Sequence, residues 1–293
     1  MEKQRLEWWI RRSHRLLGMG IGITAFTLAL MGMYTMHMLF GWNIPFDVLR
    51  ICNMWMQAHG WFSVSHLLAG LVICTFVLFI GYALDQCYGS YRAARRCNEL
   101  EQRALSDQFN EYYRPEGKRT FMIVRHAEPL ALTMGIVHRR IILSEGLLQL
   151  LDHEELEAVV HHELFHYDRR DPLKTFLLTQ AAFALWFLPM LRGIATHYKI
   201  SREVLADHAA IQQLGTPAGI GGALLKLVNR SRTRMQLPSR MIYSSFAETS
   251  LNYRIHRIIE PESRHSPQLA LWPVVISLPV LIVLSLLLLW SLI

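Results

Sequence analysis

The residues best suited to chemistry lie in the run HHELFH at 161–166. His162, Glu163 and His166 fit the pattern H-E-x-x-H. Residues four apart share one face of a helix, so the imidazoles of His162 and His166 could bind the same metal ion. Glu163 could then stand beside a metal-bound water as general base. Because the chain contains 14 His, chance alone produces this pattern in roughly a few of every hundred such chains. The surrounding sequence therefore has to show whether this run is a metal site or a chance occurrence of the pattern.

The elements around this run belong to a membrane protein. Only 18% of the residues are charged and the mean hydropathy is +0.20, values typical of chains that enter a bilayer. Three stretches exceed the ~20 residues needed to cross the hydrocarbon layer, and they are 16–40, 61–84 and 268–293. The first is too long for a signal peptide and has no cleavage site after it, so we expect three transmembrane helices.

Basic residues beside the spans predict the orientation. The N-terminal residues 1–15 are rich in Lys and Arg, the loop 41–60 carries only Arg50, and Arg92, Arg95 and Arg96 follow the second span. We therefore expect the N-terminus and the segment from residue 85 on the cytoplasmic side of the inner membrane, and the C-terminus at the outer face. The net charge of +7 suits contact of these flanks with anionic lipid headgroups.

Two other classes of protein are disfavoured. The basic residues form no compact patch interleaved with aromatic residues, and no nucleic-acid-binding motif is present, so we expect no nucleic-acid partner. The four Cys, at 52, 74, 87 and 97, contain no C-x-x-C pair, and only Cys52 would face the oxidising side. Neither a disulfide framework nor a thiolate metal cluster is expected.

The segment 85–267 is expected to form one domain between a membrane module at 1–84 and the C-terminal span. Residues 88–116 are polar and helix-compatible, and 119–126 predict a strand. Residues 134–144 predict a second strand or a hairpin that turns near His138 and Arg139, and a helix begins at Ser144.

The segment that contains H-E-x-x-H has the features of a helix. Asp152 is a suitable N-cap, and Glu155 follows three residues later, as in a capping box. His162 and His166 would lie on a face beside an apolar stripe, so the metal geometry is available. The stripe at helical spacing consists of Leu156, Val159, Val160, Leu164 and Phe165.

Residues 172–191 are apolar enough to suggest a fourth span. Asp171 and Pro172 predict the start of a helix there, and we favour a structural role for Asp171 over a catalytic one. A catalytic zinc needs a third protein ligand, for which Glu203 is the candidate. A crossing at 172–191 would place Glu203 on the opposite side from both histidines. We therefore expect 172–191 to return to the same side, as an apolar helix buried against the domain or dipping into the membrane.

Glu203 and Asp207 are spaced to share one face of a helix. One carboxylate could bind zinc while the other holds a ligand or a neighbouring helix by a hydrogen bond. Alone, such a pair is most often a solvated helix face, but here it follows H-E-x-x-H. His161 points about 100° away from His162 and is interpreted as a surface or packing residue. His208 either lines the cleft or packs.

Several ordered motifs resemble one known family. The run from ALTM at 131 to DPLK at 174, with the later blocks SREVLADHAAI and SLNYRIHRII, resembles the membrane zinc peptidases of the beta-lactam-sensing signal-transducer family. The resemblance covers about residues 119–258. It extends more loosely to the heat-shock membrane proteases and the CaaX prenyl proteases, which share H-E-x-x-H followed by E-x-x-x-D.

This resemblance implies a gluzincin-type α+β domain, mostly helical, with a small sheet whose edge strand lies above the zinc helix. It implies one catalytic Zn²⁺ bound by His162, His166 and Glu203, with water in the fourth position. Glu163 would take the proton of that water and pass it to the leaving amine while zinc polarises the scissile carbonyl.

The resemblance also assigns supporting residues and a place for substrate. Asp207 becomes a carboxylate that supports the ligands, and Arg254 and His208 are candidates for the same task or for a role in the transition state. Substrate would lie extended along an edge strand near 134–144, held by backbone hydrogen bonds.

One departure from that family bears on the signal. Its beta-lactam sensors carry a penicillin-binding domain after their last span, whereas no such domain follows residue 268 in this sequence, and the loop 41–60 is too short to be one. We therefore do not expect direct beta-lactam sensing. A sensor partner or a homo-oligomer, the membrane spans themselves, or another pathway would supply the signal.

Three functions stay open. The first is regulatory cleavage of a cytosolic repressor or a membrane protein, including self-cleavage. The second is quality control of membrane proteins by the same chemistry. The third is a catalytically silent, zinc-stabilised scaffold or receptor. The third is disfavoured because structural zinc sites are usually closed by four protein ligands. The motifs here supply three ligands and, beside them, a carboxylate in the place of a general base.

Overall fold

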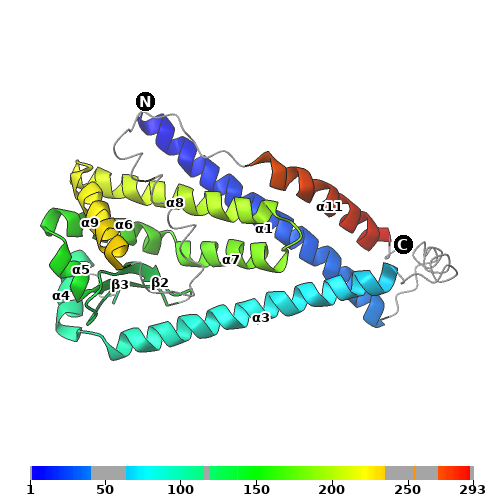
Figure 1. The fold of residues 1–293 in the computed structure, drawn as a ribbon, viewed down its shortest axis with the longest axis horizontal. Coiled ribbons are helices and arrows are strands. Elements are labelled where there is room, and N and C mark those ends of the chain that lie inside the picture. Colours follow the sequence, from blue (N-terminus) through cyan, green and yellow to red (C-terminus); the bar gives the residue numbers. More distant parts are fainter. Residues whose placement is uncertain are drawn as a thin grey trace. The chain divides into compact units, whose positions relative to one another are not determined.

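The computed structural model describes residues 2–40, 64–114, 119–136, 138–234, 254 and 270–290. Within these residues the chain is mostly helical and contains one three-stranded sheet (Figure 1), as predicted. The expected outer loop 41–60, the start of the second span and all of the block 250–259 except Arg254 lie outside the described residues.

The chain divides into two compact units. Unit 1 comprises 1–14, 87–176 and 198–267, and unit 2 comprises 15–86, 177–197 and 268–293. The expected apolar segment 172–191, from residue 177 onwards, therefore groups with the membrane spans. Four helices contribute residues to both units, and they are α1 (Glu2–Phe40), α3 (Val64–Glu99), α7 (Asp171–Ala184) and α8 (Met190–Leu214).

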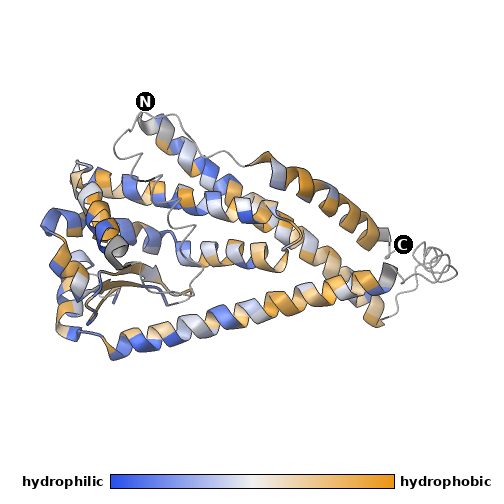
Figure 2. Cartoon of the chain, viewed as in Figure 1, coloured by the Kyte–Doolittle hydropathy of each residue, from blue (hydrophilic) through white to orange (hydrophobic). Residues whose placement is uncertain are grey.

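Unit 2 contains the hydrophobic parts of three helices that are long and apolar enough to cross a membrane. These candidates are Leu6–Phe40, His66–Glu99 and Leu271–Leu289, which confirms the predicted number of spans in the described part of the chain. Figure 2 shows α11 (Leu271–Trp290) as hydrophobic along its length, whereas α3 becomes more hydrophilic towards Glu99. The three helices meet in a buried cluster of Leu30, Met31, Tyr34, Leu68, Val72, Leu284 and Leu288.

The segment 172–191 is not one helix, so that expectation is wrong. α7 ends at Ala184, a short turn follows, and α8 begins at Met190. Proline lacks an amide hydrogen and cannot continue a helix without a break, so Pro189 favours the change of direction here. Within unit 2 this turn packs among the candidate spans, because Gln180 donates to the carbonyl of Phe79 and the amide of Met190 donates to Ser277 Oγ at 3.0 Å.

The polar stretch after the second span also differs from the prediction of a single helix over 88–116. α3 runs on to Glu99, and α4 (Arg103–Tyr113) begins after a break. At the break Glu101 forms a β-bridge with Val124, so the chain leaves helical geometry where it meets the sheet.

The sheet consists of β1 (Phe121–Val124), β2 (Ala131–Met134) and β3 (Arg140–Ser144), in the order β1-β3-β2. β1 and β3 are parallel, and β2 and β3 form an antiparallel hairpin. The predicted hairpin is confirmed, but its first strand begins at Ala131 rather than near 134. β3 is consequently the central strand, and β1 and β2 are the two edge strands.

Both faces of the sheet are covered, which explains why β1 reads as an uninterrupted apolar run. One face contributes Phe121, Ile123, Ile141 and Leu143 to a core shared with Val159 and Val160 of α6 (His153–Asp168). The other face contributes Met122, Val124 and Ile142, which pack with Cys97 at the end of α3. The sheet is thereby fixed over the helix that carries H-E-x-x-H.

Hydrogen-bonding caps set the start of the helices near the sheet. The side chain of Ser144 caps α5 (Glu145–Leu150), and Asp152 and Glu155 form the predicted capping box of α6. Each cap of this kind contributes about 1 kcal/mol. α6 also packs on α9 (Ala218–Arg234), where Gly219 and Gly222 leave room because an added Cβ would lie under 3 Å from atoms of α6.

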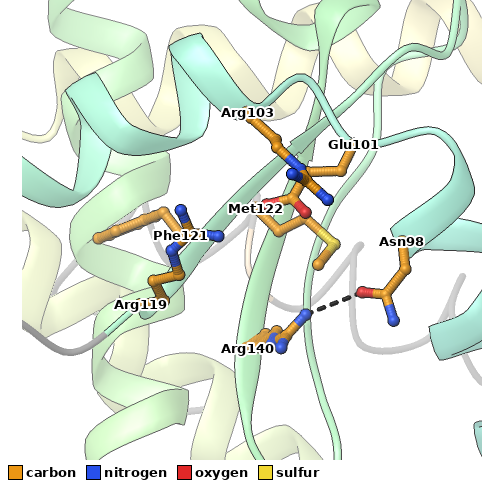
Figure 3. Close-up of a pocket in the computed structure, with 7 residues that line it drawn as sticks. All are labelled: Asn98, Glu101, Arg103, Arg119, Phe121, Met122 and Arg140. Carbon is orange, nitrogen blue, oxygen red and sulfur yellow. Dashed lines mark hydrogen bonds between the residues drawn. The ribbon is translucent and has the colours of Figure 1, made fainter.

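A cavity of about 260 Å³ lies where the end of α3, the start of α4 and the sheet meet. Figure 3 shows the hydrogen bond of 2.9 Å that Arg140 makes there with Asn98 Oδ1. Arg119 pairs with Asp107 at 3.0 Å. The cavity contains none of the predicted metal ligands, and its lining is Asn98, Glu101, Arg103, Arg119, Phe121, Met122 and Arg140.

Candidate metal centre

α6 positions two of the three predicted ligands. One turn of helix separates His162 from His166, and their Nε2 atoms lie 3.2 Å apart. Val159 and Val160 direct the same helix against the sheet, so the two imidazoles are held on a helix that cannot rotate freely. The side chains of His162 and His166 are only 7% and 12% exposed, and this burial separates their nitrogens from bulk water.

α8 supplies the third predicted ligand. Glu203 Oε2 lies 3.5 Å from His162 Nε2, and Oε1 lies 3.5 Å from His166 Nε2. The helix is held in unit 1 by Val204 and Leu205, which form a buried cluster with Trp9 of α1. The expectation that the chain returns to bring Glu203 beside both histidines thus agrees with the geometry.

The spacing of these atoms fits a zinc ion. One ligand atom from each of His162, His166 and Glu203 lies within 4.8 Å of the others, and within the described residues this is the single such group. Ligands about 2.0–2.1 Å from a tetrahedral zinc lie roughly 3.4 Å from one another. The two Nε2 atoms lie 3.2 Å apart, and each lies 3.5 Å from a different carboxylate oxygen of Glu203, distances close to that value. Two imidazoles with one carboxylate are a donor set that zinc prefers.

Asp171 contacts His166 on the side away from Glu203. Its Oδ2 atom lies 2.8 Å from His166 Nδ1 and accepts a second hydrogen bond of 2.8 Å from Arg202 Nε. A proton on Nδ1 leaves Nε2 as the atom with a lone pair for a metal. The interpretation of Asp171 as a helix-starting residue alone therefore missed this contact. Its place directly after the turn that ends α6, before a proline, was the available signal.

Asp207 and Arg254 complete a charged cluster behind the other two ligands. Asp207 Oδ1 lies 2.9 Å from His162 Nδ1. Arg254 donates to both oxygens of Asp207, at 2.7 and 2.8 Å, and lies 3.0 Å from Glu203 Oε2. The predicted association of Asp207 and Arg254 with the ligands is thus present in the geometry.

The electrostatics of this cluster favour a cation between its carboxylates. Burial alone would raise the pKa of Glu203 and of Asp207, but the Arg254 guanidinium together with the neighbouring histidines outweighs burial and holds both pKa values below their usual range. For His162, burial and Arg254 act to lower the pKa, whereas Asp207 and Glu203 raise it to about 9. The carboxylates therefore attract positive charge to this imidazole, and a bound metal would replace the proton.

Glu163 lies on the same helix, and its side chain is held by a hydrogen bond from the sheet. Glu163 is 8% exposed. Thr133 of β2 places its hydroxyl 2.8 Å from Glu163 Oε2 and 3.0 Å from the Glu163 carbonyl oxygen. Sequence reasoning did not identify Thr133, because the contact depends on how the hairpin lies over α6.

Among the residues that the structure describes, the other histidines lie outside the group formed by His162, His166 and Glu203. His161 packs edge-on against Tyr113, with ring centroids 6.4 Å apart, in agreement with its interpretation as a packing residue. His208 lies on α8 next to Asp207 and is half-buried.

These features define a class: a membrane protein whose helical unit carries an H-E-x-x-H helix, a downstream glutamate and an edge strand beside them. The chain belongs to the BlaR1 peptidase M56 family, whose model matches residues 35–258. It is therefore a member of a family of membrane proteases, and a family of metallopeptidases implies a metal ion in the cluster.

Individual relatives come from two groups of proteins. The chain is 26% identical over 118 residues to regulatory protein BlaR1 of Bacillus licheniformis, covering 39% of this chain and 20% of that protein. It is 30% identical over 222 residues to a protease HtpX homolog of Aquifex aeolicus, covering 61% of this chain and 72% of the relative. A second HtpX homolog, from Pelotomaculum thermopropionicum, is 27% identical over 194 residues, covering 53% of this chain and 69% of that relative. The chain thus spans a fifth of BlaR1 but more than two thirds of these HtpX homologs.

Proposed function

We propose that this protein is a gluzincin-type zinc metalloendopeptidase of the membrane. The observation that carries the proposal is the approach of His162, His166 and Glu203, which each place a ligand atom within 4.8 Å of the others. When bound, zinc would supply a Lewis acid that activates water and polarises the scissile carbonyl. The presence of Glu163 on the same helix argues for catalysis rather than a purely structural site.

Each residue of the cluster has a defined task in this proposal. Glu163 takes a proton from the attacking water and delivers it to the nitrogen of the leaving amine, so no net proton stays on the enzyme. Asp171 fixes His166 with Nε2 towards the metal. Asp207 does the same for His162, and Arg254 balances the charge of Asp207 and Glu203.

An extended substrate would add to β2 rather than to the segment 134–144 expected from the sequence. β3 is the central strand and has a partner on each side, whereas β1 and β2 form the two edges. Residues 100–102 already bond to the outer side of β1, and β2 is the edge strand that contacts Glu163 through Thr133. Backbone hydrogen bonds along an edge strand hold a peptide with little regard to its side chains, which suits an endopeptidase.

The orientation follows from the basic flanks of the spans. The N-terminus and the metal centre face the cytoplasm, the protein resides in the inner membrane, and the C-terminus lies at the outer face. The substrate is then a cytosolic repressor or a juxtamembrane segment of a membrane protein, including this chain itself. A separate sensor protein or a second copy of the chain would supply the signal.

Two biological roles share this chemistry. The likeness to a protein named as regulatory favours signalling by cleavage. The longer likeness to HtpX homologs, which are named as proteases, favours degradation of membrane proteins as the second candidate. A silent, zinc-stabilised scaffold is the third, and it would need a metal but not Glu163.

The test compares the wild type with Glu163→Ala, both purified from membranes. Bound zinc is measured by elemental analysis, and cleavage of co-expressed cytosolic proteins and of the chain itself is measured by mass spectrometry of new termini. Glu154→Ala, an exposed acid on the same helix, is the matched control. We expect zinc in all three proteins and cleavage lost only in Glu163→Ala. Zinc in all three without any Glu163-dependent cleavage would support the scaffold, and a wild type without zinc would refute the metal centre.

A further inference from the structure

Thr133 occupies a special position on the edge strand. The amide of Ser144 donates to the carbonyl of Leu130 at 2.9 Å, so this pair is bonded across the hairpin. Hydrogen-bonded and non-bonded pairs alternate along an antiparallel ladder. The register then makes Leu132 a bonded partner of Ile142 and leaves Thr133, opposite Ile141, in a non-bonded pair. The backbone N–H and C=O of Thr133 therefore point away from β3, towards the outer edge of the sheet.

The parallel side of the sheet gives the same result independently. The amide of Ile141 donates to the carbonyl of Thr120 at 2.8 Å, so the backbone of Ile141 is directed at β1 and not at Thr133. The backbone groups of Thr133 are thus those that an added strand would meet.

The side chain of Thr133 points to a different target. Ile141 and Leu143 belong to the face of the sheet that packs on α6, and Thr133 lies opposite Ile141. Its hydroxyl reaches the carboxylate of Glu163 at 2.8 Å and the carbonyl of the same residue at 3.0 Å. One residue therefore offers its backbone to the sheet edge and its side chain to Glu163.

We propose that Thr133 is a positioning residue that couples the docking of an extended substrate on β2 to the orientation of the Glu163 carboxylate; this rests on the proposed peptidase function. The hydroxyl holds Oε2 and leaves Oε1 to receive the proton of the attacking water.

The test uses the full-length protein in detergent with fluorescently labelled β-casein as an unfolded protein substrate. Thr133→Val removes the hydroxyl and keeps the shape, and Thr133→Ser keeps the hydroxyl. We expect Thr133→Val to lower kcat about tenfold to a hundredfold, the effect of losing a hydrogen bond to a charged group, with KM changed less than about twofold. For Thr133→Ser, which keeps the hydroxyl, we expect a kcat within about threefold of the wild-type value.

Two measurements that need no turnover accompany the kinetics. Zinc content is expected to be the same in the wild type and both variants. The affinity of the metal-free proteins for labelled casein, followed by fluorescence anisotropy, is expected to stay within about twofold, because the backbone of Thr133 is unchanged.

The outcomes separate this proposal from the one on which it rests. A Thr133→Val protein with wild-type kcat, or a Thr133→Ser protein as slow as Thr133→Val, overturns the role of Thr133 and leaves the peptidase intact. A loss confined to KM and casein affinity also overturns it, because Thr133 would then act in binding alone. If the wild type and Glu163→Ala are equally inactive on casein, the peptidase proposal fails and the role of Thr133 fails with it.

Discussion

His166 Nδ1 lies 2.8 Å from Asp171 Oδ2, on the side of the ring opposite to the Nε2 atom that faces Glu203. The same carboxylate holds the buried guanidinium of Arg202. Asp171 therefore links the end of α6 to α8 through one side chain. It fixes the ring orientation of His166, a proposed ligand, and it neutralises the buried charge of Arg202.

Asp171→Asn is expected to weaken zinc binding about tenfold to a hundredfold, as seen when partners of metal-bound histidines are removed. It is also expected to destabilise the metal-free protein by on the order of 3 kcal/mol, because Arg202 loses its buried partner. Competition with a zinc chelator and thermal unfolding measure the two effects. Asp168→Asn, which breaks the more exposed pair with Arg114, is the control and should change the stability by about 0–1 kcal/mol. Equal behaviour of the two variants would contradict the assignment.

Glu203→Gln is expected to lose zinc during purification while remaining folded. The amide keeps the shape of the side chain but removes the negative charge that the third ligand contributes. Elemental analysis gives the zinc content, and circular dichroism reports the fold. Glu154→Gln is the matched control and should retain the wild-type amount of metal. A Glu203→Gln protein that binds zinc as tightly as the wild type would show that the third ligand lies elsewhere.

Gly20→Ala is expected to destabilise unit 2 by about 1–3 kcal/mol, the usual cost of overpacking. A Cβ at this position would lie 2.4 Å from Leu178 Cδ2 and 3.2 Å from Ile194 Cγ2, so the buried side chain of Leu178 would have to move and that of Ile194 would have to give way slightly. At Gly22, on the same helix, nothing lies within 4 Å of the added atom. Gly22→Ala should therefore be neutral or slightly stabilising. Thermal unfolding in detergent compares the two, and equal midpoints would argue against packing of α7 and α8 on α1.

Residues on both sides of the segment 172–191 are expected to be accessible from the cytoplasm. Lys199→Cys and Gln149→Cys, each in a background without the other cysteines, should react with a membrane-impermeant maleimide only after the inner membrane is opened. A protein that keeps Cys52 alone should react in intact spheroplasts, because the loop 41–60 is expected outside. Labelling of Lys199→Cys but not Gln149→Cys from outside would exclude Glu203 as a ligand. Labelling of both would reverse the proposed orientation but leave the metal centre unchanged.

Much of the fold could be predicted because its signals are local. The three spans follow from uncharged runs, and the capping box at Asp152 and Glu155 follows from residue types three positions apart. The group of His162, His166 and Glu203 could also be predicted, since a zinc ligand set requires its members to meet wherever the chain goes between them.

The remaining features depend on contacts between distant residues. β2 has four residues, all half-buried, and its pairing with β3 rather than its own sequence makes it a strand. Thr133 meets Glu163 only because that pairing places the hairpin over α6. The turn after Ala184 interrupts a run of apolar residues in which Pro189 marks the start of the second helix but no residue type marks the end of the first.

The hydrogen bond between the amide of Met190 and Ser277 Oγ has a consequence for biogenesis. Met190 is the first residue of the helix that carries Glu203, and its amide has no partner within that helix. Ser277 lies on α11, which comes later in the chain than α8. A nascent chain without α11 must therefore leave this amide unsatisfied in apolar surroundings, at a cost of about 1–3 kcal/mol. Until α11 has been made, the start of the helix that carries Glu203 is therefore less stable than in a chain that contains α11.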